Sequence, residues 1–471
     1  MRKFDYLVID IGSTYTKQRL FKDRELKASA QSPTTLENVY EGIKKGQEVI
    51  KEKMGLSSLE AEHFLAASSA AGGLRMVAMG YMTRVTAKAA KEVAMNAGAK
   101  ILEVISFEDM PEYRVQILKE IKPDIILLAG GTDYGDEESL LENASLIVKS
   151  GVRCIVVIAG NIKAQEKAAE ILKQGNIDYV RVPNIMPTIH ELRVKEARDV
   201  IHREFIRQIT RAEGSHILKD KITNGKIIPT PGAVLMGAEL LAKGIDGEKG
   251  LGALIVVDLG GATTDVHSVL PEMEDLSEEE RGLVISNEKQ VSYRTVEGNL
   301  GLRVSAGGII DTVKPKRILM KRNIQDETTV ERLVEYCRFL EKNNDHIPQN
   351  REEEMFDTLL AETAVETALK RHSGYIAQEV DPVMGITPGM PIGRDLRKVQ
   401  KVIAVGGFFH HRPASLGQEV IKNALRDRGI SLLPENPEVL IDKDYILFAA
   451  GIISQTDEEY AYHVLKRYFK F

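Results

Sequence analysis

The sequence predicts an α/β protein whose core is built twice. Two distant segments, residues 6–17 and 254–265, carry one motif: an apolar strand, Asp, one apolar residue, Gly, small or hydroxylic residues and a second strand. Between these segments, apolar strands alternate with helical patterns, which is typical of a parallel sheet. A third segment, residues 402–408, reads as a short buried strand that ends in Gly-Gly and opens toward a helix.

Each of the two hairpins can hold a phosphate beside a metal ion. Asp10 and Asp258 end buried strands, where a rigid carboxylate can orient Mg²⁺, an ion that takes few protein carboxylates and keeps several waters. Gly12, Gly260 and Gly261 lack a Cβ, so the backbone can turn tightly and bring its N–H groups to an anion. The other turn residues expected to contact the phosphates are Ser13, Thr14, Ala262, Thr263 and Thr264. Two facing hairpins would grip a nucleotide triphosphate from both sides; two ordinary glycine-turn hairpins are the alternative.

Two further features extend the expected nucleotide site. Gly406 and Gly407, followed by Phe408, would let a flat adenine ring lie against bare backbone. Lys17 lies three residues past Thr14 and could reach a terminal phosphate as a point charge. A solvated surface lysine is the alternative reading of Lys17.

Size and composition exclude some classes of protein. A chain of 471 residues can form two or three hydrophobic cores. The 63 Lys and Arg against 69 Asp and Glu give a net charge of −6, which argues against a nucleic-acid or membrane-surface binder. The only cysteines, Cys154 and Cys337, offer no disulfide framework and no metal spacing. With neither a signal peptide nor an apolar run long enough to span a membrane, we expect a cytoplasmic protein.

Three regions are expected along the chain. Residues 1–110 form a first half-domain with the first hairpin, 111–225 an inserted α/β region, and 226–471 a second half-domain with the second hairpin and the Gly-Gly strand. Inside the inserted region, residues 130–132 read Gly-Gly-Thr, but the acidic start of the next helix would repel phosphate, so a structural turn is favoured. Residues 188–210 predict a long charged helix that offers a surface to a partner.

The order of first hairpin, second hairpin and late Gly-Gly strand resembles the actin, hexokinase and heat-shock ATPase superfamily. Residues 228–237 look like its first connecting helix and residues 445–451 like its second. The resemblance implies two ribonuclease-H-like half-domains around a cleft for ATP and Mg²⁺, with Asp10 and Asp258 as catalytic and metal-binding residues. Heat-shock ATPases carry a catalytic Glu just before the Pro-Thr of the first connecting helix, where this chain has Ile228. We therefore expect a weak Mg²⁺-dependent ATPase at most.

Nearly the whole chain is similar to the glutamate mutase accessory proteins, the GlmL or MutL family, which is unrelated to the DNA-repair protein of that name. The segments that carry this resemblance are residues 67–75, 128–133, 254–267 and 406–411. The resemblance implies an ATP-dependent chaperone that reactivates an adenosylcobalamin-dependent mutase by nucleotide-driven hinge motion. The implied partners are the mutase subunits, with glutamate mutase as the expected enzyme.

Two other functions remain open on this sequence. A small-molecule kinase of the same superfamily needs a catalytic Asp, for which Asp133 and Asp265 are the candidates. A non-catalytic nucleotide-binding scaffold is the other, although the intact Asp of each hairpin argues against it. His267 lies in an Asp-x-His, but Leu270 stands where cobalamin modules continue with Gly, so we expect a strand histidine with a satisfied hydrogen bond.

Overall fold

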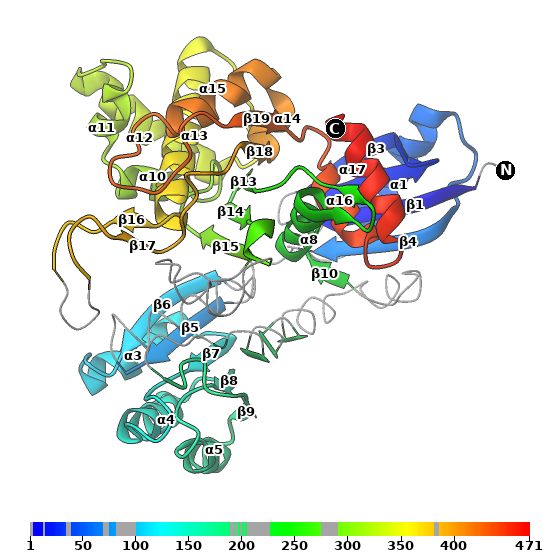
Figure 1. Cartoon of the computed structure of the whole chain (residues 1–471). Coiled ribbons are helices and arrows are strands. Elements are labelled where there is room, and N and C mark those ends of the chain that lie inside the picture. The colour runs from blue at the N-terminus through cyan, green and yellow to red at the C-terminus, as the bar shows by residue number, and fades with distance from the viewer. Residues whose placement is uncertain are drawn as a thin grey trace. The chain divides into compact units, whose positions relative to one another are not determined.

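The computed structural model describes residues 3–12, 15–33, 39–68, 75–81, 100–188, 193, 196–197, 200–201, 203–204, 227–274, 291–380 and 386–471. The chain divides into two compact units. Unit 1 combines Met1–Ser68 with His216–Phe471, and unit 2 comprises Ser69–Ser215. Figure 1 shows the helices and strands of both units, which are described separately below.

The first sheet of unit 1 has five strands in the order β10-β4-β1-β2-β3. Its members are β1 (Phe4–Ile11), β2 (Tyr15–Lys22), β3 (Glu25–Pro33), β4 (Ala61–Ser68) and β10 (Ile227–Pro229). The first three strands form an antiparallel meander, whereas β4 runs parallel to β1 and β10 runs parallel to β4. Helix α1 (Val39–Met54) follows the meander and packs against β3.

The second sheet of unit 1 repeats the first, strand by strand. Its order is β15-β14-β13-β18-β19, again a three-stranded meander followed by two parallel strands. Its members are β13 (Leu254–Leu259), β14 (Thr264–Val269), β15 (Ser292–Glu297), β18 (Lys401–Val405) and β19 (Glu438–Ile441). The duplicated α/β core that the two hairpin motifs predict is therefore confirmed.

Helices cover both faces of the second sheet. The remaining elements of unit 1 are α8 (Thr230–Lys243), β11 (Gly244–Ile245), β12 (Glu248–Lys249), the 3₁₀ helix η1 (Pro271–Met273), α10 (Ala306–Thr312), α11 (Pro315–Met320), α12 (Glu327–Lys342), α13 (Arg351–His372), β16 (Tyr375–Ile376), β17 (Pro391–Ile392), α14 (Gly407–His411), α15 (Ala414–Ala424), α16 (Ile446–Ile453) and α17 (Glu458–Phe469). Alternate residues of β13 point to opposite faces. Ile255 and Val257 enter a core with α12 and α13, whereas Leu254 and Val256 enter a core with α8, α16 and the first sheet.

Helices α8 and α16 cross so closely that each places a glycine against the other's backbone. A Cβ on Gly451 would lie 1.9 Å from the carbonyl oxygen of Ala233, and a Cβ on Gly237 would lie 2.0 Å from that of Leu447. Every residue of α16 is buried. The crossing therefore requires glycine at both contact points.

We expect Gly451→Ala to lower the free energy of unfolding by about 2 kcal/mol or more, because the added methyl group overpacks the crossing. Gly232→Ala is the matched control: Gly232 lies in the first turn of α8, and a Cβ there would meet nothing within 4 Å. Since Ala has the higher helix propensity, the control should gain about 0.5 kcal/mol. Urea unfolding of both variants measures the difference, and equal stability of the two would contradict the proposed packing.

Unit 2 is a single parallel sheet with the strand order β6-β5-β7-β8-β9. Its strands are β5 (Arg75–Gly80), β6 (Lys100–Ser106), β7 (Ile125–Leu128), β8 (Ile155–Ile158) and β9 (Asp178–Arg181). Three neighbouring helices, α3 (Pro111–Ile121), α4 (Glu138–Ser150) and α5 (Gln165–Gln174), pack on one face. Numbered along the chain, this order is 2-1-3-4-5, which is a doubly wound arrangement.

The boundaries of the two units differ from the expected ones at 110 and 225. β5 and β6 lie before residue 110 but pair in the sheet of unit 2, and β10 lies after residue 225 but pairs with β4 of the first sheet. Unit 2 is thus inserted between the fourth and fifth strands of the first sheet. The charged helix expected over residues 188–210 lies largely outside the described residues.

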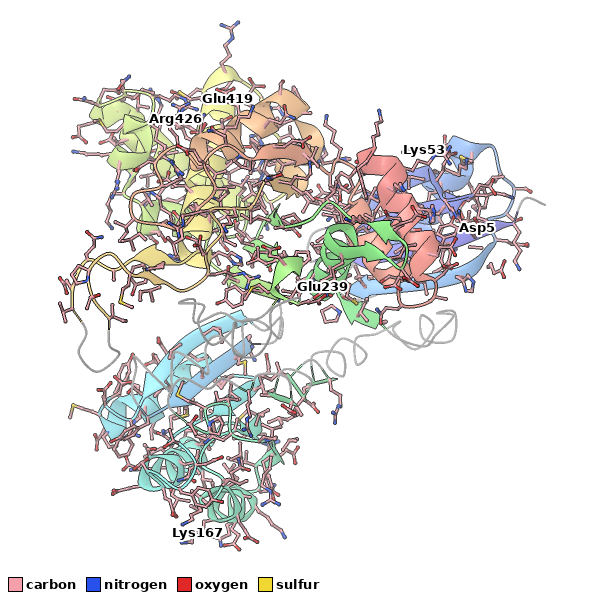
Figure 2. All side chains as sticks on the ribbon, in the orientation of Figure 1. Asp5, Lys53, Lys167, Glu239, Glu419 and Arg426 are labelled. Carbon is pink, nitrogen blue, oxygen red and sulfur yellow. The ribbon has the colours of Figure 1, made fainter. Side chains whose placement is uncertain are left out.

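The end of the chain also returns to the first sheet. Helix α17 contacts β3 and α8. The Tyr460 hydroxyl of α17 donates to Asp5 at the start of β1, with an O–O distance of 2.9 Å, and Figure 2 labels Asp5 at this position. Helix α17 therefore packs on the first sheet of unit 1, although the expected boundaries place it in the second half-domain, residues 226–471.

Candidate functional site

The first hairpin has the tight turn that its sequence predicts. Asp10 lies opposite Lys17 in the pairing of β1 with β2, and the Gly12 N–H donates to the carbonyl oxygen of Tyr15 at 3.0 Å. A Cβ on Gly12 would lie 2.6 Å from that same oxygen, so the turn requires glycine. The other two expected phosphate contacts of this turn lie outside the described part of the chain: Ser13 and Thr14.

The second hairpin repeats this geometry. Asp258 lies opposite Asp265 in the pairing of β13 with β14, and the Gly260 N–H donates to the carbonyl oxygen of Thr263 at 2.9 Å. The carbonyl oxygen of Gly261 accepts the N–H group of Arg303 at 2.9 Å, so the carbonyl side of the turn is closed by the following loop. The N–H groups of the Gly261–Ala262 tip donate to no oxygen atom of the described residues, which leaves them available to an anion.

Asp10 is held on both of its oxygens. It is 1% exposed, its Oδ1 accepts the Thr230 hydroxyl at 2.5 Å, and its Oδ2 lies 3.5 Å from the Lys17 ammonium. The same ammonium lies 3.7 Å from the centre of the Tyr445 ring. Burial lowers the pKa of Lys17, but Tyr445, Asp10 and Asp258 outweigh it and raise the pKa above its ordinary value. Lys17 is therefore a partly buried, charged group held by Asp10 and Tyr445, and not a fully solvated surface lysine.

Asp258 differs from Asp10 because no hydrogen bond or ion pair among the described residues satisfies its carboxylate. Burial, and then the negative charges of Asp265 and Asp10, raise its pKa from 3.8 to about 7, while Lys17 acts in the opposite direction. A carboxyl with a pKa raised in this way favours a bound cation. No group of three or more His, Cys, Asp or Glu side chains in the described ranges is placed to hold a metal, so waters or phosphates would have to complete the shell, as Mg²⁺ prefers.

We expect Asp258→Asn to stabilise the ligand-free protein at pH 8 and to leave it unchanged at pH 4. A folded-state pKa of about 7 against 3.8 means that the cost of ionising Asp258 is absent below about pH 4 and is complete above pH 7. Asn carries no charge and avoids that cost. The gain at pH 8 should be about 1–2 kcal/mol, below the full linkage value because Asp258 is partly exposed. Urea unfolding of both proteins at the two pH values measures this gain in stability. A gain that is the same at both pH values would disprove the raised pKa of Asp258.

Asp265, a candidate base for a kinase, is already committed to a structural ion pair. It is buried, it accepts the Arg294 Nε at 3.0 Å and forms an ion pair with the same guanidinium, and it accepts the Thr263 hydroxyl at 2.9 Å. Its charge is therefore compensated within the second sheet. This arrangement leaves Asp265 little freedom to accept a proton from a substrate.

Asp133, the other candidate base, lies in unit 2 and ties loops together. One of its carboxylate oxygens accepts the Ile162 N–H at 3.0 Å and the Asn184 side-chain amide at 2.9 Å. The Gly130-Gly131 turn that precedes Asp133 has positive φ angles of 154° and 65°. This geometry fits the structural turn that the sequence favours for residues 130–132.

His267 is fully buried, and neither of its ring nitrogens has a hydrogen-bond partner among the residues that the structure describes. Burial, and then the charge of Arg294, lower its pKa well below the ordinary value, so the ring is neutral. The expected satisfied hydrogen bond is therefore wrong. The reason is that Arg294, the residue opposite His267 on β15, directs its guanidinium to Asp265 instead.

Of the three residues of the expected adenine contact, only Gly407 lies open. A Cβ on Gly407 would meet nothing within 4 Å. Gly406 has φ +127°, and a Cβ there would lie 2.2 Å from the carbonyl oxygen of Leu259, so this glycine is needed for packing against the second hairpin. The Phe408 side chain is buried in the core and packs edge-on against Phe409.

Two residues of the site have little signal in the sequence. Thr230, the first residue of α8, binds Asp10, and Tyr445, which precedes α16, covers Lys17. Tyr445 has φ +54°, in the left-handed region, and each of these contacts joins residues more than two hundred positions apart. Only the resemblance of 228–237 and 445–451 to connecting helices points toward them.

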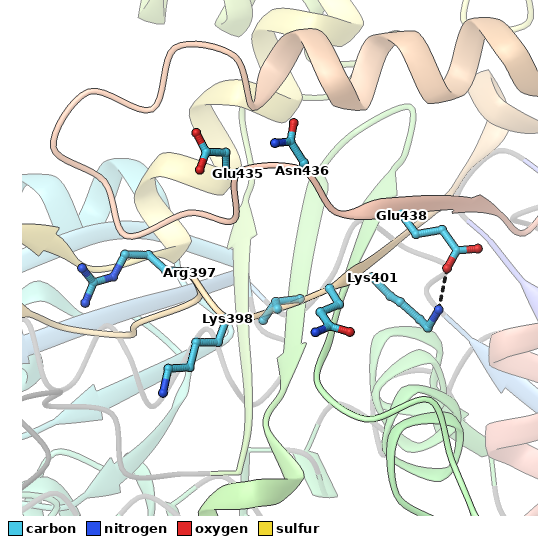
Figure 3. Close-up of a pocket in the computed structure, with 8 residues that line it drawn as sticks. Arg397, Lys398, Lys401, Glu435, Asn436 and Glu438 are labelled. Carbon is cyan, nitrogen blue, oxygen red and sulfur yellow. Dashed lines mark hydrogen bonds and ion pairs between the residues drawn. The ribbon is translucent and has the colours of Figure 1, made fainter.

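One surface cavity, of about 720 Å³, contains none of the expected site residues. It lies where β18 and β19 begin, and two of its lining residues, Lys401 and Glu438, form an ion pair (Figure 3). A smaller cavity of about 300 Å³ lies beside α17 and includes Asp444 and Tyr468. Neither cavity coincides with the hairpins.

The repeated sheets, the paired Asp-x-Gly hairpins and the two crossing helices define a protein of the actin-like ATPase fold. The chain belongs to the MutL family, whose model, described as MutL protein, matches residues 6–469. The resemblance stated from the sequence is thus confirmed. Protein MutL of Clostridium tetanomorphum is 37% identical over 469 residues, which cover 98% of each chain.

Two of the matching solved structures show a distant similarity to this chain. Nucleotide-free acetone carboxylase has 12% identity and a TM-score of 0.43, over 96% of this chain and 70% of that one. Nucleotide-free diol dehydratase-reactivating factor has 11% identity and a TM-score of 0.32, over 97% of this chain and 100% of that one. Scores this low carry no argument about function. In the described ranges, no helix is long and apolar enough to cross a membrane.

Proposed function

We propose that this protein binds ATP with Mg²⁺ between its two hairpins and uses its nucleotide state to reactivate a partner enzyme. The observation that carries the proposal is the convergence of both hairpins on one cation. The Lys17 ammonium lies 3.5 Å from Asp10 of the first hairpin. Asp258 of the second hairpin is close enough to Lys17 to raise the pKa of this lysine. Two turns with equivalent hydrogen bonds therefore share one electrostatic site within unit 1.

In this proposal, each group of the site has a distinct part. The N–H groups of the Gly261–Ala262 tip hold phosphate, and Gly12 keeps the first turn tight through its own hydrogen bond to Tyr15. Asp10 and Asp258 hold Mg²⁺, through water where the carboxylate is already engaged, and the metal neutralises phosphate charge when bound. Lys17, which contacts Asp10 and the Tyr445 ring, supplies a positive charge for the terminal phosphate.

The same contacts link the nucleotide site to the two crossing helices. Asp10 accepts the hydroxyl of Thr230, the first residue of α8, and Lys17 lies on the ring of Tyr445, directly before α16. Asp442 fixes the start of α16 by accepting the N–H groups of Ile446 and Leu447, both at 2.9 Å. A ligand that draws Lys17 away from the Tyr445 ring changes the contacts at the start of α16. The ligand-bound and ligand-free states then differ in interaction free energy, which a conformational switch requires.

Turnover of ATP should be slow. Ile228, next to Pro229 at the start of α8, packs against the apolar core where heat-shock ATPases have an acid. An aliphatic side chain cannot position or deprotonate water, and loss of such a group costs about 10²-fold or more in rate. The proposed activity is therefore a nucleotide-controlled binding cycle with weak ATPase turnover.

The proposed partner is an adenosylcobalamin-dependent mutase, with glutamate mutase as the particular enzyme. Membership in the MutL family supports this proposal, together with a fold that can couple nucleotide to shape. The kinase alternative has no observation in its favour. Asp265 is held by Arg294, and Asp133 is held by backbone and amide donors of its own unit.

We expect Asp10→Asn and Asp258→Asn each to weaken Mg²⁺-dependent ATP binding at least 10-fold, because each removes one negative charge from the metal site. Asn at position 10 can still accept the Thr230 hydroxyl, which makes it a milder change than Ala at this buried position. Gly407→Val is the matched steric variant: it should weaken adenosine binding and keep the Mg²⁺ dependence. Calorimetric titration with ATP, with and without Mg²⁺, measures all three, and parental binding by either Asp variant would refute the hairpin assignment.

We expect capture of glutamate mutase subunits to depend on nucleotide, with affinities that differ about 5–150-fold between the ATP and ADP states. The experiment immobilises the protein and offers purified subunits with ATP, with ADP or without nucleotide. Recovery of inactivated mutase is then followed after addition of ATP, Mg²⁺ and adenosylcobalamin. Equal capture in the three states, without ATP-dependent recovery, would exclude the reactivating function.

A further inference from the structure

Unit 2 exposes its large apolar side chains at one edge of its sheet. Within the described part of unit 2, these side chains are Met110 (72% exposed), Tyr113 (46%), Tyr134 (74%) and Ile162 (54%). Met110 and Tyr113 follow the carboxyl end of β6, Tyr134 follows that of β7, and Ile162 follows that of β8. Because the strands of a parallel sheet all end at the same edge, the four residues belong to one surface, here called the carboxyl-edge surface.

Tyr134 is the least expected member of this surface. Its φ of 64° lies in the left-handed region, which a bulky residue rarely adopts. The loop holds it there, because Asn161 accepts the Tyr134 N–H at 3.2 Å and the Gly135 N–H donates to Thr132 at 3.0 Å. Glycine or asparagine would adopt this conformation with less strain. A strained aromatic residue held out to solvent indicates a function outside the folding of the loop.

Ile162 lies beside Tyr134 for a structural reason. Its N–H donates to the Asp133 carboxylate at 3.0 Å, which ties the loop after β8 to the loop after β7. Lys163, the next residue, places its ammonium 4.9 Å from the Tyr134 ring. Both apolar side chains therefore project from loops fixed by hydrogen bonds, so little conformational entropy is lost when a partner covers them.

The loops that carry the apolar residues of β6 and β7 are strongly acidic. Residues 106–113 and 130–138 contain seven acidic residues and no Lys or Arg. These acidic residues are Glu108, Asp109, Glu112, Asp133, Asp136, Glu137 and Glu138. Some also serve the fold, as Asp136 does by accepting the Ser139 N–H at 3.2 Å. The surface thus combines apolar anchors with a negative rim, the usual composition of a protein interface.

We propose that the carboxyl-edge surface is the docking site for the partner enzyme, with Tyr134 and Ile162 as anchors. The complementary partner surface is an apolar pocket bordered by Lys and Arg, since opposite charges at the rim steer association. Protruding anchors on fixed loops fit a protein partner better than a small molecule, which needs a concave site. The acidic rim would repel nucleic acid. This inference rests on the proposed function, because it concerns the partner that function requires.

The test uses the full-length protein and purified glutamate mutase subunits as the probe. Tyr134→Asn and Ile162→Asn should each weaken subunit binding at least 10-fold. Asn tolerates the left-handed region, so Tyr134→Asn should keep or raise the midpoint of thermal unfolding, and both variants should bind ATP like the parent. The matched control is Ile347→Asn, which alters an equally exposed apolar residue of unit 1 (52%) and should bind the subunits normally.

A second measurement addresses the rim. Glu112→Gln combined with Glu138→Gln should slow association at low salt and reduce its salt dependence, because both changes remove negative charge from the edge. If the parent protein binds no subunit in any nucleotide state, the proposed function fails and this inference fails with it. If the parent binds and the two Asn variants bind equally well, or the control weakens as much as they do, the docking surface is wrong while the proposed function stands.

Discussion

The close crossing of α8 and α16 is the constraint on which the rest of unit 1 depends. Two helix backbones can approach this far only because Gly237 and Gly451 present no side chain to each other's carbonyl groups. The crossing fixes where both helices begin. Thr230 can then donate to Asp10, and Tyr445 can cover Lys17. The charged residues of the first hairpin are therefore positioned by helices that are distant in the sequence.

The two hairpins balance their charges in different ways. The first turn pairs its Asp with Lys17 on the opposite strand, whereas the second turn has Asp265 at the equivalent position and therefore two neighbouring carboxylates. Arg294 compensates one of them and leaves Asp258 with a raised pKa. Such an uncompensated charge lowers stability and is a common property of ligand sites. The asymmetry leaves more uncompensated negative charge at the second hairpin, which supports the proposal that Asp258 takes part in holding a cation.

Local sequence signals predicted local structure well. Both hairpins and their glycines follow from short patterns, and the duplicated sheets follow from the repeated motif. The unit boundaries could not be predicted in this way, because the partner of β5 is set by packing and β10 has only three residues. The Tyr445 contact and the His267 ring without a described hydrogen-bond partner depend on which distant side chains Lys17 and Arg294 contact in the folded protein. The periodicity of a sequence segment carries no information about such contacts.

The insertion of unit 2 between β4 and β10 has a consequence for how the chain is made. β4 leaves the ribosome with one edge unpaired, and its partner β10 follows only after residues 69–226 have been synthesised. An unpaired strand edge is a template for association with other chains. Closing so long a connection costs less entropy once unit 2 has become compact. The speed with which unit 2 folds therefore decides how long nascent chains remain open to aggregation through the first sheet, even where every residue of the proposed nucleotide site is intact.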